Sequence, residues 1–197
     1  MNKLDVLAYV LIGFILIVCG YIYFETDSFQ LKCIVSTVDG NKYCVRERGN
    51  IQKAADLLAK VTEKCKRLVN YMKEKYPDKE NVKRLVEGYN PKKIMETLPT
   101  SEYTAYSENK GEKLAFCLDT EKKNGRLIDI NTLTYVALHE LSHIATKSIG
   151  HTDEFWQNFK FLITEAKKIK IYNPIDYSKT PARYCGMNIT DNPYYNV

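Results

Sequence analysis

The sequence contains no Cys-x-x-Cys pair, no internal repeat and no low-complexity segment. Without cysteines paired at short spacing, a zinc site built from cysteines is not expected. Apolar residues make up 45% of the chain and charged residues 27%, which is typical of a globular protein and not of a disordered one. The length of 197 residues fits one compact domain with an anchor and is too short for two ordinary domains.

The positive charge of the chain is modest and dispersed. The formal net charge is +5, and lysine pairs are scattered along the sequence, for example at Lys92-Lys93 and Lys167-Lys168. No aromatic residues alternate with these lysines, as they would in a groove that binds nucleic acid. The pattern indicates a solvated, lysine-rich surface, and nucleic acid is not predicted as a partner.

A stretch without any charged residue extends from Val6 to Phe24. As a helix these 19 positions reach roughly 28 Å, about the thickness of the bilayer core. The run ends in Tyr-Ile-Tyr-Phe-Glu-Thr and not in small residues, so it is a poor cleavage site for a signal peptide. The sequence therefore predicts a retained transmembrane anchor over residues 1–27, followed by a domain over residues 28–197.

The charges on either side of this run predict how the anchor is oriented. Counting the α-amino group, the flank before the run is more positive than the flank after it by about one charge, and the more positive flank favours the cytosol. We therefore expect a single-pass membrane protein with a cytosolic N-terminus and the domain on the opposite side of the membrane.

Hydrophobic periodicity predicts both helices and strands in the domain. The expected helices cover residues 50–76, 132–147 and 152–170, with shorter helical turns at 82–87 and 92–98. The expected extended segments are a hairpin over 31–48, strands at 103–106 and 113–118, a short piece at 127–130 and an extended tail from residue 172. Asn50 is a candidate cap for the first helix, and Asp129 or Asn131 for the second. This mixture predicts an α+β fold with a small sheet.

One of the six cysteines, Cys19, lies in the anchor, which leaves five for the domain. Because five is odd, at least one of them has no partner within a monomer. Cys33 and Cys44 flank the turn of the expected hairpin and can form a disulfide in an oxidising compartment. The sequon Asn188-Ile189-Thr190 can be glycosylated only if the domain faces this oxidising side of the membrane.

All three histidines of the chain lie within thirteen residues, at His139, His143 and His151. His139 and His143 are four residues apart, so on a helix both imidazoles project from one face and can reach one tetrahedral zinc ion. Glu140 is rotated by about 100° from His139 around the helix axis, which places its carboxylate beside the metal. There it can take a proton from a zinc-activated water.

A catalytic zinc site needs three protein ligands and an open position. Gly150 allows the chain to reverse after the helix, so that His151 can return to the metal as the third ligand. Glu165, on the following helix, is a second candidate for the third ligand. A deformylase-like site would use Cys117, but the glycine-rich signature of such sites is missing. A closed structural zinc site and a set of three core histidines are the remaining interpretations.

The segment His139-Glu140-Leu141-Ser142-His143, followed by Gly150-His151 and Phe155-Trp156, resembles the WLM and SprT-like group of zinc metallopeptidases. The match runs from about residue 114 to residue 159. The whole chain, anchor included, resembles WLM-type proteins of large DNA viruses. By this resemblance the three histidines correspond to the zinc ligands and Glu140 to the catalytic glutamate. The eight-residue step from His143 to His151 is longer than in the closest WLM relatives.

The resemblance implies a minimal zincin-like metallopeptidase domain behind a transmembrane helix. A strand is expected above the active-site helix, and residues 113–118 are the candidate, along which an extended peptide could pair. The expected function is that of a membrane-anchored zinc metallopeptidase acting on a protein or peptide substrate, with Glu140 as general base. Two competing functions are a catalytically silent structural or virion membrane component that keeps the fold, and a DNA-associated SprT-like protease.

Because every histidine belongs to the expected metal site, the group that stabilises the oxyanion must be of another type. Tyr172, Tyr177 and Tyr184 are candidates, and the sequence does not choose among them. The segment Cys185-Gly186-Met187 is a candidate for a turn beneath the metal, of the kind that a methionine provides in metzincins.

Overall fold

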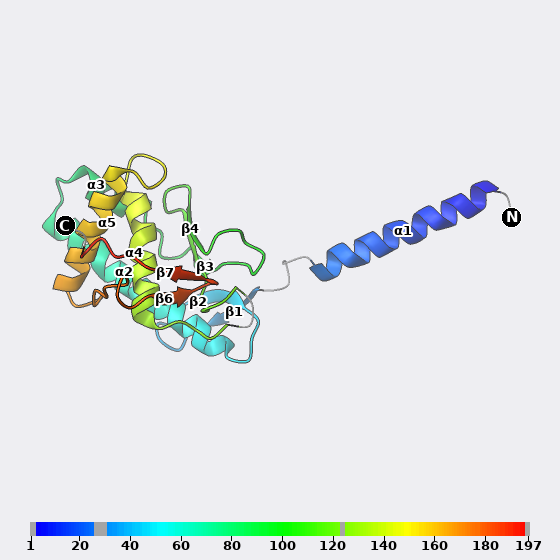
Figure 1. Cartoon of the computed structure of the whole chain (residues 1–197), viewed down its shortest axis with the longest axis horizontal. Coiled ribbons are helices and arrows are strands. Elements are labelled where there is room, and N and C mark those ends of the chain that lie inside the picture. Colours follow the sequence, from blue (N-terminus) through cyan, green and yellow to red (C-terminus); the bar gives the residue numbers. More distant parts are fainter. Residues whose placement is uncertain (1–2, 26–30, 123–124, 196–197) are drawn as a thin grey trace. The chain divides into compact units, whose positions relative to one another are not determined.

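The computed structural model of the chain describes residues 3–25, 31–122 and 125–195. The chain divides into two compact units, Met1–Gln30 and Leu31–Val197. The described part of the first unit is helix α1 (Lys3–Glu25), shown in blue in Figure 1. Its segment Asp5–Tyr23 is long and apolar enough to cross a membrane by length and composition, a test that a signal sequence also meets.

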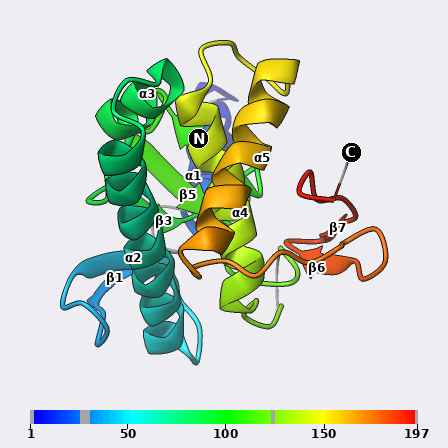
Figure 2. The ribbon, with the colours of Figure 1, turned by 90° about the vertical axis from the view of Figure 1, so that its left-hand side faces the viewer.

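The second unit has an α+β fold, as the sequence predicts. Its helices are α2 (Ile51–Lys75), α3 (Glu80–Gly88), α4 (Ile130–Ala145) and α5 (Asp153–Lys168). Helix α4 contacts each of the other three, and twelve of its sixteen residues are buried. Figure 2 shows α4 and α5 next to each other, with α2 beside them. A helix that is surrounded by others on most of its circumference has a well-defined position, which favours a site that needs fixed geometry.

The apolar stripe predicted for the first domain helix is confirmed in α2. Its residues Leu58, Val61, Leu68 and Met72 are fully buried in the hydrophobic core. Asn50 precedes this helix, and its backbone carbonyl accepts a hydrogen bond from the Ala54 amide. Its side chain makes no capping hydrogen bond, so the predicted cap is wrong in that respect.

Within the described residues, the strands form three small sheets. The first is an antiparallel hairpin of β1 (Leu31–Val35) and β2 (Lys42–Arg46), as predicted. The second has the order β3-β5-β4, where β3 (Ile94–Glu96) is parallel and β4 (Ala105–Glu108) antiparallel to β5 (Lys113–Phe116). The third is an antiparallel hairpin of β6 (Ala182–Tyr184) and β7 (Met187–Ile189).

Three expectations about extended segments are wrong. Residues 94–96, expected within a helical turn, form β3, because parallel pairing with β5 decides their conformation. The tail from residue 172, expected to be extended throughout, contains the β6–β7 hairpin. The strand at 113–118, expected to offer an edge to a peptide, is the central β5 and has a neighbour on each side. The edge strands are β3 and β4, and β4 also contacts α4.

Candidate metal centre

The register of α4 is set at its first turn by Asp129. The Asp129 carboxylate accepts hydrogen bonds from the backbone amides of Asn131 and Thr132, each at 2.9 Å, and from the Thr132 hydroxyl at 2.6 Å. Of the two candidate caps in the sequence, Asp129 therefore caps the helix. This cap fixes where the helix begins, and with it the face from which the histidines project.

The structure brings the three histidines together around one point. The Nε2 atoms of His139 and His143 are 3.2 Å apart, and those of His139 and His151 are 3.0 Å apart. One ring nitrogen from each residue lies within 4.8 Å of the others. Three nitrogens that bind one zinc ion tetrahedrally at about 2.0–2.1 Å lie about 3.3 Å from one another. The donor set therefore fits a zinc ion held by three imidazoles, with one position open.

Phe155, at the start of α5, packs against all three imidazole rings. Its ring centroid lies 4.4 Å from that of His143, 4.7 Å from that of His151 and 4.9 Å from that of His139. Phe155 is fully buried, and its backbone amide donates to the Thr152 hydroxyl that caps α5. One apolar side chain thus restricts the rotation of three candidate ligands.

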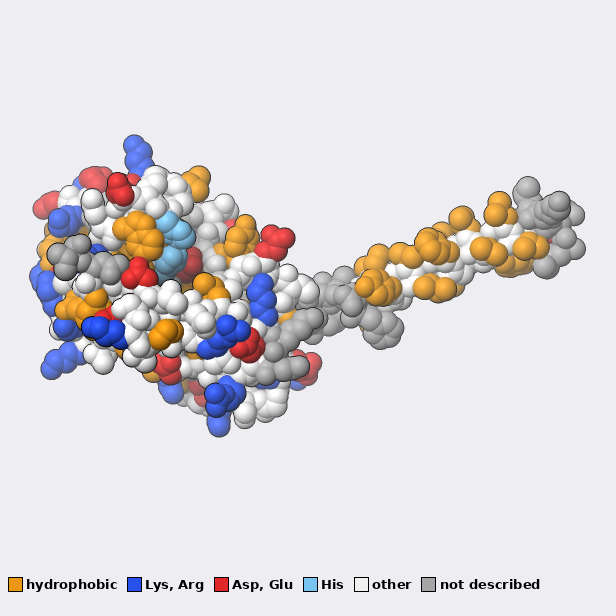
Figure 3. Space-filling model, viewed as in Figure 1, with side chains coloured by type: hydrophobic (Ala, Val, Ile, Leu, Met, Phe, Trp, Pro, Cys, Tyr) orange, Lys and Arg blue, Asp and Glu red, His pale blue; other side chains and the backbone are white. Residues whose placement is uncertain are grey.

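The site is open to the surface on one side. His151 is exposed, and the Trp156 ring, 40% exposed, lies 5.8 Å from the His151 ring between centroids. Figure 3 shows the histidine surface next to a hydrophobic patch on this face of the domain. A substrate can reach the histidines from here, while His139 and His143 stay half-buried.

Burial and mutual repulsion keep two of the histidines neutral. Desolvation, followed by the nearby His143 and His151, lowers the pKa of His139 to about 3. The pKa of His143 is lowered to about 4, by desolvation first and then by the charges of His151 and Lys110. Metal binding needs the neutral imidazole, so both rings are in the form that binds zinc at neutral pH.

Glu140 is buried beside the histidines and is only 5% exposed. Burial raises the pKa of its carboxyl to about 8. A cation held by the histidines would act in the opposite direction and favour the carboxylate. Glu140 is therefore a buried titratable group that follows His139 directly in the sequence, and its surroundings control its pKa.

The two other candidate ligands, Glu165 and Cys117, are both engaged in interactions with residues outside the histidine cluster. The Glu165 carboxylate is buried and forms ion pairs with Lys75 and Lys168 and a hydrogen bond with Tyr71. Cys117 forms a disulfide with Cys185. Among the described residues, the group that can hold a metal at this place consists of the three histidines.

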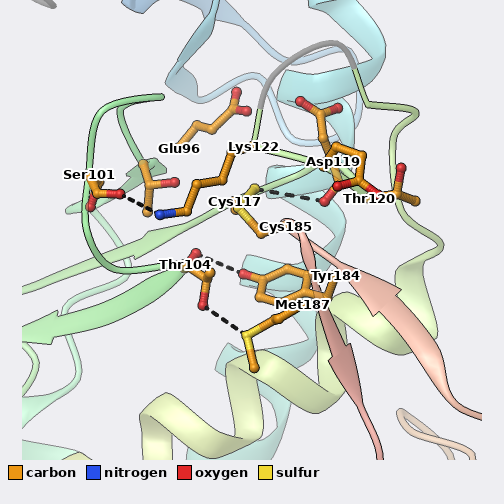
Figure 4. The surroundings of a disulfide bond; sticks show 12 residues. Glu96, Ser101, Thr104, Cys117, Asp119, Thr120, Lys122, Tyr184, Cys185 and Met187 are labelled. Atoms are coloured by element: carbon orange, nitrogen blue, oxygen red, sulfur yellow. Dashed lines mark hydrogen bonds between the residues drawn. A yellow bond between two sulfur atoms is a disulfide. The ribbon is translucent and has the colours of Figure 1, made fainter.

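The three candidate tyrosines for oxyanion stabilisation are buried, at most 3% exposed. Tyr172 and Tyr177 pack against Tyr135, with ring centroids 6.1 Å and 5.0 Å away. Tyr184 donates its hydroxyl proton to the Thr104 carbonyl oxygen at 2.9 Å, as Figure 4 shows. Burial raises the pKa of Tyr184, and the negative charge of Glu140 raises it further. In this structure these side chains build the core, and the hydroxyl of Tyr184 is already engaged.

Sequence reasoning missed the disulfide between Cys117 and Cys185. It joins the end of β5 to the turn of the β6–β7 hairpin (Figure 4). Cys185 and Gly186 form this two-residue turn with φ of 48° and 82°, the positive values that tight hairpin turns need. A signal was available, because Cys65 belongs to the buried stripe of α2 and its exclusion leaves these two cysteines as a pair.

Two backbone hydrogen bonds fasten the same turn, from Cys185 to the Asp119 carbonyl and from Gly186 to the Thr120 carbonyl, each at 2.9 Å. Met187 follows the turn. Its side chain is 48% exposed, and its sulfur accepts a hydrogen bond from the Thr104 hydroxyl at 3.8 Å. The segment therefore forms a turn, as predicted, and the Met187 side chain lies at the surface against Thr104, while a place of this turn beneath the metal stays a prediction.

Sequence and structure comparisons place the chain among known proteins. The sequence model of the WLM domain matches residues 42–194. An uncharacterized protein of Acanthamoeba polyphaga mimivirus is 30% identical over 187 residues, which cover 92% of this chain and 94% of that protein. An uncharacterized protein of Invertebrate iridescent virus 6 is 34% identical over 64 residues, covering 32% of this chain and 36% of the relative.

Among solved structures, the crystal structure of Wss1 from Saccharomyces cerevisiae aligns with a TM-score of 0.45 and 18% identity, covering 63% of this chain and 84% of Wss1. The family match covers more than three quarters of the chain, including all three histidines and Glu140. The chain therefore belongs to the WLM domain family of zincin-like metalloproteases and is similar to proteins of large DNA viruses.

Proposed function

We propose that this protein is a membrane-anchored zinc-dependent metallopeptidase, with His139, His143 and His151 as zinc ligands and Glu140 as general base. The observation that carries the proposal is the convergence of the three histidines. The Nε2 atom of His139 lies 3.2 Å from that of His143 and 3.0 Å from that of His151, and the Glu140 carboxyl group next to His139 in the chain is buried. Three imidazole ligands with an open fourth position are typical of catalytic and not of structural zinc sites.

When bound, zinc would supply a Lewis acid that polarises a peptide carbonyl and lowers the pKa of water. The Glu140 carboxylate would take a proton from the attacking water and deliver it to the leaving amine. The buried Glu140 carboxyl suits both steps. Burial raises its pKa, which favours holding the proton, and a cation held by the histidines would lower its pKa, which favours releasing it. Phe155 keeps the three imidazoles oriented and excludes water from behind them.

We propose that the substrate is a peptide in extended conformation that pairs with β4. This strand is at the edge of its sheet and contacts α4, so a peptide added to it would run near the helix that carries His139 and His143. The sequence predicts this pairing at the central strand β5, but β5 has a neighbouring strand on each side.

Helix α1 is proposed to anchor the protein in a membrane, with the N-terminus in the cytosol. Its length and apolar composition support a span. The two disulfides, Cys33–Cys44 and Cys117–Cys185, support an oxidising environment for the domain.

The test uses the full chain purified in detergent. Metal content is measured by elemental analysis, and hydrolysis of an unstructured protein such as casein is compared between wild type, Glu140→Gln and Glu63→Gln, a control at an exposed glutamate of α2. We expect one zinc per chain in all three, and cleavage that only Glu140→Gln abolishes. Absence of zinc from the wild type would refute the metal site. Zinc without cleavage across a panel of unfolded proteins would support a catalytically silent component instead.

A further inference from the structure

The segment between α4 and α5 has to bring His151 back to the other two histidines. Helix α4 ends at Ala145, two residues after His143, and α5 begins at Asp153. Residues 146–152 between them are not helical, and Gly150 has a positive φ of 86°. This loop, at the top of Figure 2, carries one of the three candidate ligands at an exposed position. The hydroxyls of Ser148 and Thr152 lie 2.8 Å apart within the loop, and side chains outside the loop hold its backbone.

The first such contact comes from Lys110. Its ammonium group donates hydrogen bonds to the carbonyl oxygens of Thr146 and Ser148, each at 2.8 Å, and of His143 at 3.1 Å. The last carbonyls of a helix have no partner within the helix, and a cation near them is favourable. Lys110 thus caps α4 and holds the first half of the loop from a site more than thirty residues away in the sequence.

The position of Lys110 is itself fixed by backbone packing. It lies in the turn between β4 and β5, where Asn109, Lys110 and Gly111 all have positive φ. Gly111 approaches the end of α3 so closely that a Cβ atom on it would lie 2.4 Å from the Gly88 carbonyl oxygen. The ammonium group is therefore presented from a turn that is pinned against α3.

The second contact comes from Glu154 in the first turn of α5. Its carboxylate accepts hydrogen bonds from the backbone amide of Lys147 at 3.1 Å, and from the amide and hydroxyl of Ser148 at 3.4 and 3.3 Å. Arg84 of α3 pairs with the same carboxylate at 2.9 Å and donates to the Ala145 carbonyl at 2.8 Å. An anion thus binds the amides of the loop, while a cation binds its carbonyls.

We propose that Lys110 and Glu154 are positioning residues that present His151 to the zinc ion. Neither residue touches the metal position; each acts through the backbone of the loop. The inference rests on the proposed function, because it assumes that the three histidines bind zinc. Loss of a group that orients a ligand typically weakens metal affinity about 10- to 100-fold, and we expect this range for Lys110→Met and for Glu154→Gln.

The experiment measures zinc affinity of the full chain in detergent by competition with a chromophoric chelator. The variants are Lys110→Met, Glu154→Gln and the control Lys113→Met, which removes a lysine of β5 that pairs with Glu108. The first two should bind zinc about 10 to 100 times more weakly, and the control within about twofold of wild type, since losses of this kind should be confined to the loop contacts. Thermal unfolding of the metal-free forms checks that all variants fold; if Lys110→Met does not, Glu154→Gln carries the test.

A His151→Ala background separates positioning from general damage. If Lys110 acts through His151, Lys110→Met should cause no further loss of zinc affinity once His151 is absent, which is the result of a double-mutant cycle for coupled residues. An equal loss in both backgrounds would overturn the proposal, as would wild-type affinity in both loop variants. In either case the zinc site itself would stand, whereas a wild type that binds no zinc would refute the proposed function.

Discussion

Removal of the Cys117–Cys185 disulfide should destabilise the domain more than removal of Cys33–Cys44. The first closes a loop of 68 residues in sequence separation and the second a loop of 11. In the chain-entropy treatment, a disulfide restricts the unfolded chain, and the free energy rises with the logarithm of loop length. This gives about 4.4 kcal/mol for the longer loop and about 2.8 kcal/mol for the shorter one, a difference of about 1.6 kcal/mol.

The longer disulfide also has a local role in the native state. It holds the β6–β7 hairpin, and with it Tyr184, against the segment that follows β5 (Figure 4). When the covalent link is missing, the two backbone hydrogen bonds at Cys185 and Gly186, the Tyr184–Thr104 hydrogen bond and the exposed Arg183–Glu121 ion pair remain. Each of these hydrogen bonds contributes only about 1 kcal/mol net, and an exposed ion pair contributes little, so the hairpin should detach more often than the rest of the domain unfolds.

The assay is urea unfolding of the Leu31–Val197 unit, comparing Cys117→Ala/Cys185→Ala with Cys33→Ala/Cys44→Ala. The free energy of unfolding is taken from the midpoint and slope of each curve. Limited proteolysis should cut the first variant early, near the hairpin, and the second elsewhere. A thiol titration gives the control: the oxidised wild-type unit has one free thiol, Cys65, whose burial raises its pKa to about 12, so it should react only after unfolding.

Two results would refute this reasoning. One is an equal loss of stability in the two double variants, which would mean that loop length does not govern the effect. The other is a loss smaller than about 1 kcal/mol in Cys117→Ala/Cys185→Ala, well below the typical range for native disulfides.

Three further predictions concern single residues. Burial raises the pKa of Asp56, but hydrogen bonds from Ser36 and Thr37 outweigh this effect and lower the pKa from 3.8 to about 2. Because the pKa is lower in the folded than in the unfolded protein, the ionised carboxylate stabilises the fold. This stabilisation is complete above pH 3.8 and is lost as the pH falls towards 2. Asp56→Asn should thus cost about 1 kcal/mol at pH 7 after solvent screening and flatten the acid limb of the stability curve, and an unchanged limb would contradict it. Tyr184→Phe removes one of two hydrogen bonds to the Thr104 carbonyl, which also accepts from the Cys117 amide at 2.8 Å, so it should cost about 1 kcal/mol and leave kcat nearly unchanged; a fall in kcat of about 100-fold at equal stability would instead make Tyr184 an oxyanion donor. With the domain on the lumenal side, exposed Asn188 should carry a glycan that glycosidase treatment or Asn188→Gln removes, and an unglycosylated chain in microsomes would contradict the proposed orientation.

The sequence alone was sufficient for features that depend on local pattern. The uncharged run of α1, the apolar stripe of α2, a cap at Asp129 or Asn131 and the spacing of His139 and His143 all follow from local composition, helical periodicity and capping chemistry. The hairpin with Cys33 and Cys44 follows in the same way from its turn residues. In each case the residues that decide the structure are close together in the chain.

Only the tertiary structure decided the features that join distant segments. The parallel strand β3 forms because β5 lies beside it, and Cys117 meets Cys185 because the C-terminal hairpin folds over the end of β5. The loop that presents His151 is held by Lys110, whose partners lie more than thirty residues further along the chain. A sequence pattern reports the face and period of one element. Which charge meets which carbonyl is determined when the elements pack, so the third histidine was predictable as a candidate, while the contacts that fix its position were not.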